Sequence, residues 1–317
     1  MKTLSPVRPT TAFPRLVSSG VELDPAHMGR LTDSTSLLGD TAALRERMEA
    51  DGYLYLPGYL GRAGVLEARR EVVRRLEAAG HIKPGTDPMD AILNPALNRH
   101  SNFQPDLARG NAPLHTVLYA GSMIDLYERL LGGAVRHYDF TWLRSVGPGK
   151  GTPSHLDSVY MNRGTHRVFT AWVPLGDVSF QLGGLMVLPG THRNQRLKET
   201  YGMQDVDAFC ENKPDAKSWG KPWGTGGHLR GDPNQIRRSV AGAEARWLTA
   251  DFRAGDLLTF TIFTMHASLD NTTADRIRFS SDSRYQLASE PADERWVSVD
   301  GRPPSGHTDA ARRGKIC

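Results

Sequence analysis

The chain has 317 residues, of which 39% are hydrophobic and 23% are charged, an ordinary composition for a globular protein. The net charge of +4 is small, and no basic stripe interleaved with aromatic residues is present, which argues against a nucleic-acid partner. Two cysteines, Cys210 and Cys317, are too few for a disulfide framework or a zinc ribbon and fit a reducing cytoplasm.

The N-terminal third is expected to hold an arm and then supporting helices. Its first residues lack the apolar core of a signal peptide. The whole chain has no apolar run of about eighteen residues, so we expect a cytoplasmic protein without a membrane partner. Residues 1–38 are rich in Pro, Ser, Thr and Gly, which predicts an extended or partly ordered arm. Apolar residues at helical spacing then predict helices that pack on one face of a sheet. The predicted segments are helices at 41–50, 64–79 and 122–131, within a supporting region of about 40–133, and a strand at 53–57.

From about Val135 the pattern changes to short bursts of β-forming residues separated by Gly, Pro and Asn. Many short strands with turn signals between them predict a mainly β fold of the jelly-roll, cupin-like kind, flanked by helices, in one domain. The predicted strands are 137–144, 168–174, 185–189, 247–252, 257–266 and 276–287.

Residues 193–245 interrupt this pattern without clear periodicity and contain Trp219 and Trp223. A loop of this length inside a compact domain is usually functional or disordered. Two interpretations stay open: a lid-like insertion that covers substrate, or a surface insertion without a role.

The most informative motif is His155-Leu156-Asp157. In a strand, residues two apart point to the same side, so both side chains can serve one metal ion. The same spacing recurs at His307-Thr308-Asp309, but that copy lies in a Pro/Gly-rich tail and no histidine follows it. We therefore interpret the second copy as part of a solvated tail.

A third ligand is expected from His266, which closes the apolar run 257–263. Two histidines and one carboxylate on one side of a metal form the facial triad of non-haem Fe(II) oxygenases. Because residue 157 is an aspartate that can bind the metal, no coordination position is left for a halide ion. A Gly or Ala at this position would instead have indicated a halogenase. The sequence thus predicts His155, Asp157 and His266 as iron ligands, provided that their strands are neighbours.

Two arginines follow the distal histidine, in Asp275-Arg276-Ile277-Arg278. In a strand, Arg276 and Arg278 would point the same way, one strand over from the metal. A planar guanidinium suits the far carboxylate of a 2-oxoglutarate cosubstrate. Arg276 is the first choice and Arg278 the second, and a salt bridge that only stabilises the fold is the alternative for either.

With these residues in hand, the chain resembles the phytanoyl-CoA dioxygenase family of Fe(II)/2-oxoglutarate oxygenases from about residue 44 to 287. The resemblance rests on several segments that occur in the family's order. These are 48–60, His155-Leu156-Asp157, Thr170-Ala171-Trp172-Val173-Pro174-Leu175, 183–192 and 266–273.

The resemblance implies a double-stranded β-helix with Fe(II) on His155, Asp157 and His266 and with 2-oxoglutarate on Arg276. Trp172 and Ser268 match positions that flank the cosubstrate, although a core aromatic is the alternative for Trp172. His192 is expected to be structural, in the turn after its strand.

The implied activity is O2-dependent hydroxylation of an unactivated C–H bond in a small molecule. The substrate could be a natural-product intermediate or an acyl-CoA, and desaturation, epoxidation and ring closure are not separated from hydroxylation. Two rivals from other classes are a jelly-roll module that only binds a ligand and a zinc hydrolase on the same three ligands. The oligomeric state is left open.

Overall fold

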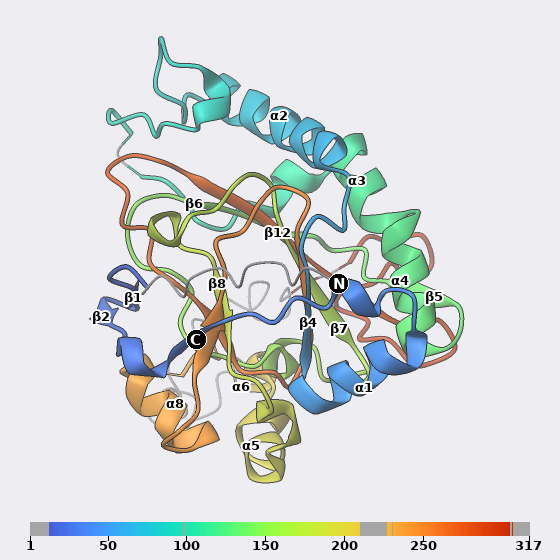
Figure 1. Ribbon diagram of the computed structural model, residues 1–317. Helices are drawn as coiled ribbons and strands as arrows, with labels where there is room; N and C mark the ends of the chain where they lie inside the picture. The colour runs from blue at the N-terminus through green and yellow to red at the C-terminus, as the bar shows by residue number, and fades with distance from the viewer. Residues whose placement is uncertain (1–12, 98, 210–226, 230, 305, 307–317) are drawn as a thin grey trace, which may run out of the picture.

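The computed structural model describes residues 13–97, 99–209, 227–229, 231–304 and 306, and two β-sheets form its centre (Figure 1). Among the described residues, β3 and β9 form a parallel pair and the other strand pairs of these two sheets are antiparallel. The six-stranded sheet has the order β4 (Tyr53–Leu56), β10 (Leu257–Thr261), β7 (Phe169–Pro174), β12 (Arg278–Leu287) and β5 (Val135–His137), with β6 (Trp142–Val146) also paired to β12. The four-stranded sheet has the order β11 (His266–Ser268), β8 (Leu185–Val187), β9 (Trp247–Thr249) and β3 (Met28–Arg30).

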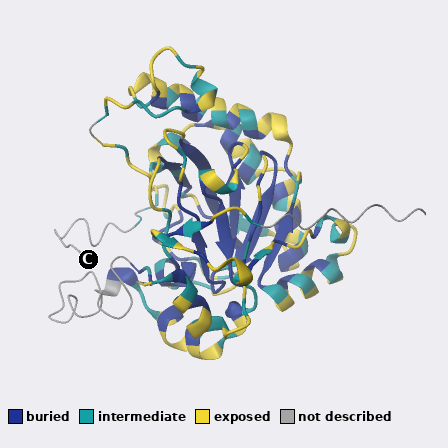
Figure 2. Ribbon diagram, turned by 60° about the vertical axis from the view of Figure 1, so that its left-hand side comes forward, coloured by how far each residue is buried: buried dark blue, intermediate teal, exposed yellow. Residues whose placement is uncertain are grey.

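Four helices cover the outer face of the six-stranded sheet, where Figure 2 shows their exposed residues turned outward and the strands buried beneath them. They are α1 (Thr41–Asp51), α2 (Arg62–Ala78), α3 (Ala112–Tyr119) and α4 (Ser122–Leu131). Their apolar stripes share one core with the outward side chains of the sheet, such as Val173, Phe279 and Tyr285. The expected supporting helices are therefore present. The sequence analysis missed α3, which has only two turns and carries Pro113 in its first turn.

Smaller elements surround the four-stranded sheet and the ends of the barrel. The remaining strands and α-helices of the described residues are β1 (Val17–Ser18), β2 (Val21–Glu22), α5 (Gln195–Glu199), α6 (Val206–Phe209) and α8 (Pro233–Ala241). The 3-10 helices are Pro25–His27, Thr35–Leu37, Pro88–Asp90, Pro105–Ala108, Asp157–Tyr160, Phe180–Leu182, Thr191–Arg193 and Tyr201–Met203.

Several expected elements differ in detail. The N-terminal arm is more ordered than its composition indicated: Leu16, Leu23 and Met28 are buried in the second core cluster, and β3 pairs with β9. The predicted strand 137–144 is divided into β5 and β6. The predicted strand 257–266 is divided into β10 and β11 by a turn in which the Thr264 amide donates to the Thr261 carbonyl.

The interval 193–245 contains α5, α6 and α8, while its middle part, 210–226 with Trp219, Trp223 and Cys210, lies outside the described residues. Its role as a lid therefore stays a prediction. The tail motif His307–Asp309 and Cys317 also lie outside the described residues. None of the helices in the described part of the chain has the length and apolarity that a membrane crossing needs.

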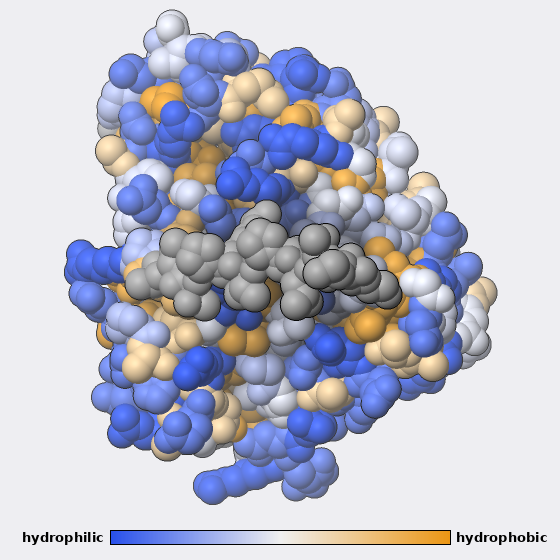
Figure 3. All heavy atoms as spheres, viewed as in Figure 1, coloured by the Kyte–Doolittle hydropathy of each residue, from blue (hydrophilic) through white to orange (hydrophobic). Residues whose placement is uncertain are grey.

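The surface is mostly hydrophilic, with small apolar spots, on the face seen in Figure 3. Among the described residues, Phe103 and Met203 are the large apolar side chains that are exposed.

The inward face of β12 is polar, which sets the position of the site. Because strand side chains alternate, Arg278, Asp282 and Arg284 share one side. All three line a cavity between the two sheets, whereas Phe279 and Tyr285 pack against the helices on the other side. Each of the three inward residues is buried.

Candidate metal centre

The two histidines face each other through backbone pairing. His155 and His266 form an isolated antiparallel bridge, in which the His155 amide donates to the His266 carbonyl at 2.9 Å and the reverse bond measures 3.1 Å. The His-x-Asp motif is not part of a regular strand, in contrast to the expectation, because Asp157 begins the 3-10 helix Asp157–Tyr160. The bridge and this turn together bring the three side chains to one point.

The three expected ligands converge. The Nε2 atoms of His155 and His266 each lie 3.7 Å from Oδ1 of Asp157. All three residues are at most 4% exposed, so bulk water does not compete for the ligand atoms. Within the described residues, this is the group of His, Cys, Asp and Glu side chains whose geometry can hold a metal ion.

Hydrogen bonds select the tautomer that a metal ligand needs. The Nδ1 atom of His155 lies 2.8 Å from the Pro153 carbonyl, and that of His266 lies 3.0 Å from the Thr264 carbonyl. Because a carbonyl only accepts, each Nδ1 carries the proton and donates. The Nε2 lone pairs are therefore free to bind a metal, and both imidazole rings are held in place.

Electrostatics keep His266 neutral and the carboxylate of Asp157 charged. Burial, followed by the neighbouring His155, lowers the pKa of His266 from 6.5 to about 3. Burial alone would raise the pKa of Asp157, but the cation of Arg284 and the two histidines hold it well below its usual value. Two neutral imidazoles and one carboxylate are the donor set that non-haem Fe(II) takes, so the residues fit this metal.

Two residues that the sequence analysis missed hold the other carboxylate oxygen. Oδ2 of Asp157 accepts hydrogen bonds from the Thr170 hydroxyl at 2.5 Å and from Nη2 of Arg284 at 2.8 Å. One signal was available, because Arg284 lies an even number of residues after Arg278 and therefore on the same face of β12.

The structure places the two arginine candidates in different surroundings, and only Arg278 of the two lines the cavity of the histidines. Arg276 precedes β12, is exposed, and lines a surface hollow together with Asp177 and Arg253. Arg278, the first residue of the strand, is 1% exposed and lines the same cavity as His155 and His266. The two side chains do not point the same way, because the strand pattern begins only at Arg278.

Arg278 is a buried cation with little to neutralise it. Its Nη1 donates to the Ser280 hydroxyl at 3.1 Å, and its Nε has no hydrogen-bond partner among the described residues. Burial lowers its pKa from 12.5 to about 10, so the guanidinium still carries its charge at neutral pH. The other cavity arginines, Arg144 and Arg284, are paired with Asp282 and Asp157, each at 2.8 Å.

Trp172 and Ser268 both line the cavity. Trp172 is fully buried, packs edge-on against Phe252 at a ring distance of 4.7 Å, and has no described partner for its Nε1–H. It is therefore both a core aromatic and part of the cavity wall. The Ser268 hydroxyl accepts from the Thr152 amide at 2.6 Å, which fixes the side chain at the rim of the site.

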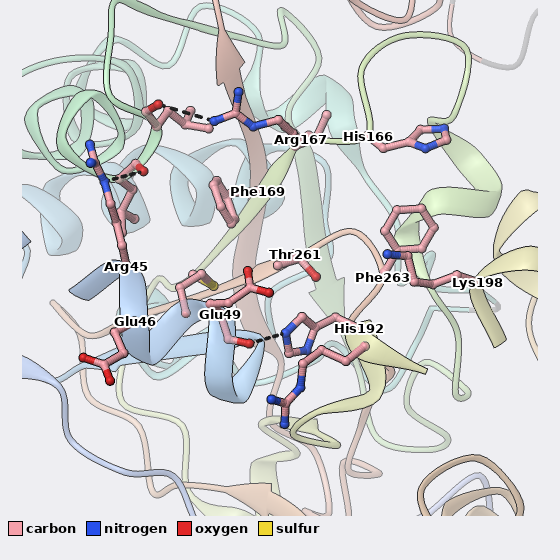
Figure 4. A pocket seen from close by; sticks show the side chains of 15 residues that line it. Arg45, Glu46, Glu49, His166, Arg167, Phe169, His192, Lys198, Thr261 and Phe263 are labelled. Atoms are coloured by element: carbon pink, nitrogen blue, oxygen red, sulfur yellow. Dashed lines mark hydrogen bonds between the residues drawn. The ribbon is translucent and has the colours of Figure 1, made fainter. Parts of the chain in front are cut away.

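The large hollow in Figure 4 is a different place, with a volume of about 810 Å³ and none of the triad in its lining. Two of its charged groups bind the protein itself: Arg45 donates to backbone carbonyls of α4, and Arg167 pairs with Glu290 at 2.7 Å. His192 in this wall lies 2.9 Å from the Glu49 carbonyl through Nε2. This contact between two segments of the fold is consistent with the structural role expected for His192.

Comparisons with known proteins agree with this site. The family model "Phytanoyl-CoA dioxygenase (PhyH)" matches residues 48–280. A Streptomyces exfoliatus protein, 1-deoxypentalenic acid 11-beta-hydroxylase, is 30% identical over 275 residues, which cover 81% of this chain and 85% of that protein. The protein of the same name from Streptomyces arenae is 29% identical with the same coverage.

Solved structures with the same fold include two non-haem α-ketoglutarate-dependent enzymes from nogalamycin biosynthesis. The carbocyclase SnoK has a TM-score of 0.54 and 19% identity, covering 83% of this chain and 88% of that chain. The epimerase SnoN has a TM-score of 0.51 and 20% identity, covering 80% and 84%. At these identities the likeness shows the fold, a double-stranded β-helix, and nothing about the reaction.

Proposed function

Since this chain belongs to the phytanoyl-CoA dioxygenase family, and is an Fe(II)- and 2-oxoglutarate-dependent hydroxylase, we propose that it hydroxylates a small natural-product intermediate, with Arg278 as the cosubstrate anchor. The supporting observation is the composition of one buried cavity. His155 and His266 line it, with Asp157 beside them in the triad, together with Arg278, an arginine that no described carboxylate pairs.

The residues divide into those that hold the metal and those that hold the cosubstrate. When bound, Fe(II) and 2-oxoglutarate supply the O2 activation that an unactivated C–H bond requires. The three ligands would hold the metal, with Nε2 of each histidine and Oδ1 of Asp157 as the atoms that lie together. Arg278 binds the distal carboxylate of 2-oxoglutarate, because a guanidinium donates two parallel N–H bonds to a carboxylate and the cavity otherwise leaves this cation unpaired.

An aromatic cluster packs behind Arg284, which is one of the residues that line the cavity. Arg284 lies over the ring of Trp142, which belongs to an aromatic cluster with Phe140 and Trp296 at ring distances of 4.7 to 5.2 Å. Aromatic faces of this kind bury apolar area and exclude water. The Streptomyces relatives named above are hydroxylases of 1-deoxypentalenic acid, so this acid is the first compound to test.

The test is a succinate assay on anaerobically loaded protein that is then exposed to O2. We expect succinate and a hydroxylated product with a small natural-product acid such as 1-deoxypentalenic acid, and background turnover with an acyl-CoA. Product from an acyl-CoA alone would favour the alternative substrate class. No 2-oxoglutarate binding by the metal-loaded protein would favour a jelly-roll module that only binds a ligand.

A further inference from the structure

Resting on the proposed function, we propose that Thr170 and Arg284 are positioning residues that reserve Oδ2 of Asp157, so that this carboxylate offers only one oxygen to the metal. The two oxygens have separate environments. Oδ1 lies 3.7 Å from both ligand nitrogens, while Oδ2 accepts from the Thr170 hydroxyl at 2.5 Å and from Arg284 at 2.8 Å.

The sheet fixes both donors at once. Thr170 in β7 and Arg284 in β12 are directly opposite in the antiparallel register, so their side chains emerge side by side on the inward face. Trp142 supports the guanidinium, whose Cζ lies 4.1 Å from the ring centroid. Thr170 is fully buried and Arg284 is 2% exposed, which leaves water no access to replace either hydrogen bond.

This arrangement matters because of how many metal positions the protein must leave open. A facial triad fills three of six positions, a chelating 2-oxoglutarate needs two, and O2 needs the last. A carboxylate that bound through both oxygens would take one of these three. An oxygen already engaged by a hydroxyl and a guanidinium is a poor second ligand, since binding the metal would break two hydrogen bonds that water cannot replace.

Arg284 does not use all of its N–H donors on Asp157. Its Nε and Nη1 are buried without a hydrogen-bond partner among the described residues, although its Nη2 is engaged by Asp157. A guanidinium whose only function was to balance the Asp157 charge could satisfy the carboxylate with two parallel bonds. The single bond to Oδ2 leaves Oδ1 turned toward the histidines.

The test uses substitutions that remove or keep one hydrogen-bond donor at a time and a readout that needs no turnover. Thr170→Val removes the hydroxyl without changing charge or volume, Thr170→Ser keeps it, and Arg284→Gln and Arg284→Lys change the second donor. Each protein is loaded anaerobically with Fe(II) and titrated with 2-oxoglutarate, following the visible charge-transfer band of the complex. The ligand-field spectrum of the Co(II)-substituted protein reports metal geometry independently.

We expect Thr170→Val and Arg284→Gln to weaken metal affinity by roughly 10- to 100-fold, the range found when groups that orient metal ligands are removed. Both should also weaken 2-oxoglutarate binding and change the Co(II) spectrum. Thr170→Ser should restore wild-type behaviour, and Arg284→Lys should lie between.

Two matched controls remove similar groups elsewhere. Thr249→Val deletes a buried strand hydroxyl that donates to the Leu185 carbonyl at 2.7 Å, and Arg237→Gln removes a buried arginine that donates to backbone carbonyls after α8. Both should leave the Co(II) spectrum unchanged. Wild-type spectra and affinity in folded Thr170→Val and Arg284→Gln proteins would overturn the inference. Failure of the wild-type chain to bind 2-oxoglutarate would instead overturn the proposed function.

Discussion

Replacing Arg278 by methionine should raise the stability of the metal-free protein and lower its affinity for 2-oxoglutarate in the Fe(II) form. The side chain is 1% exposed, and burial lowers its pKa from 12.5 to about 10. At 1.36 kcal/mol for each pKa unit, its charge costs the metal-free protein about 3 kcal/mol as an upper bound. Methionine has a similar length and no charge, so the metal-free protein should gain about 1–3 kcal/mol in free energy of unfolding.

The same change should weaken 2-oxoglutarate binding. Removing one partner of a buried, hydrogen-bonded charge pair costs about 2–5 kcal/mol, which corresponds to a dissociation constant at least about 30-fold higher. Urea unfolding of the metal-free protein and anaerobic 2-oxoglutarate titration of the Fe(II) protein measure the two effects. A residue with only a structural role would not combine higher stability with weaker binding.

Arg276→Met is the matched control, because Arg276 is exposed and lies outside the metal cavity. Arg276→Met should change the free energy of unfolding by less than about 0.5 kcal/mol and leave 2-oxoglutarate affinity unchanged. The reasoning would be refuted if Arg276→Met weakened 2-oxoglutarate binding while Arg278→Met left it intact.

Three further predictions concern the ligands and the insertion. Asp157→Ala should abolish stoichiometric iron binding and succinate formation, and full turnover would mean that the wrong carboxylate was identified. In the metal-free protein, folding lowers the pKa of His266 from 6.5 to about 3. Below pH 6.5 the unfolded chain binds a proton that the folded chain does not, so the free energy of unfolding falls as the pH drops. Between pH 7 and pH 5 the loss in free energy of unfolding is about 2 kcal/mol. Urea unfolding measures it, and an equally steep pH dependence in a His266→Gln protein would contradict the assignment to His266. Exchanging residues 193–245 for those of the Streptomyces exfoliatus hydroxylase should change which substrates are accepted, and an unchanged substrate profile would argue against the lid.

Sequence patterns were sufficient for the parts of the fold that depend on local periodicity. The helices α1, α2 and α4 carry apolar stripes, and β7 and β10 are rich in β-formers, so their existence followed directly from the sequence. The triad was predictable for a different reason. The His-x-Asp spacing and a histidine closing an apolar strand restrict the chemistry even when the fold around them is unknown.

The remaining features depend on where strands begin and on which residues they face. Arg276 and Arg278 differ because β12 starts at Arg278, and strand boundaries are the least certain part of any pattern analysis. The contact of Thr170 and Arg284 with Asp157 requires the register of β7 against β12, which brings together residues more than a hundred positions apart. No local spacing contains that information.

The central claim is that one buried cavity holds both Fe(II), on three side chains, and 2-oxoglutarate, on Arg278. Anaerobic titration of the wild-type chain with 2-oxoglutarate, in the presence and absence of Fe(II), tests it most directly. The account predicts one Fe(II) per chain, a visible charge-transfer band, and tight cosubstrate binding only when the metal is present. Cosubstrate binding that is indifferent to Fe(II), or a chain that takes up no iron, would contradict it.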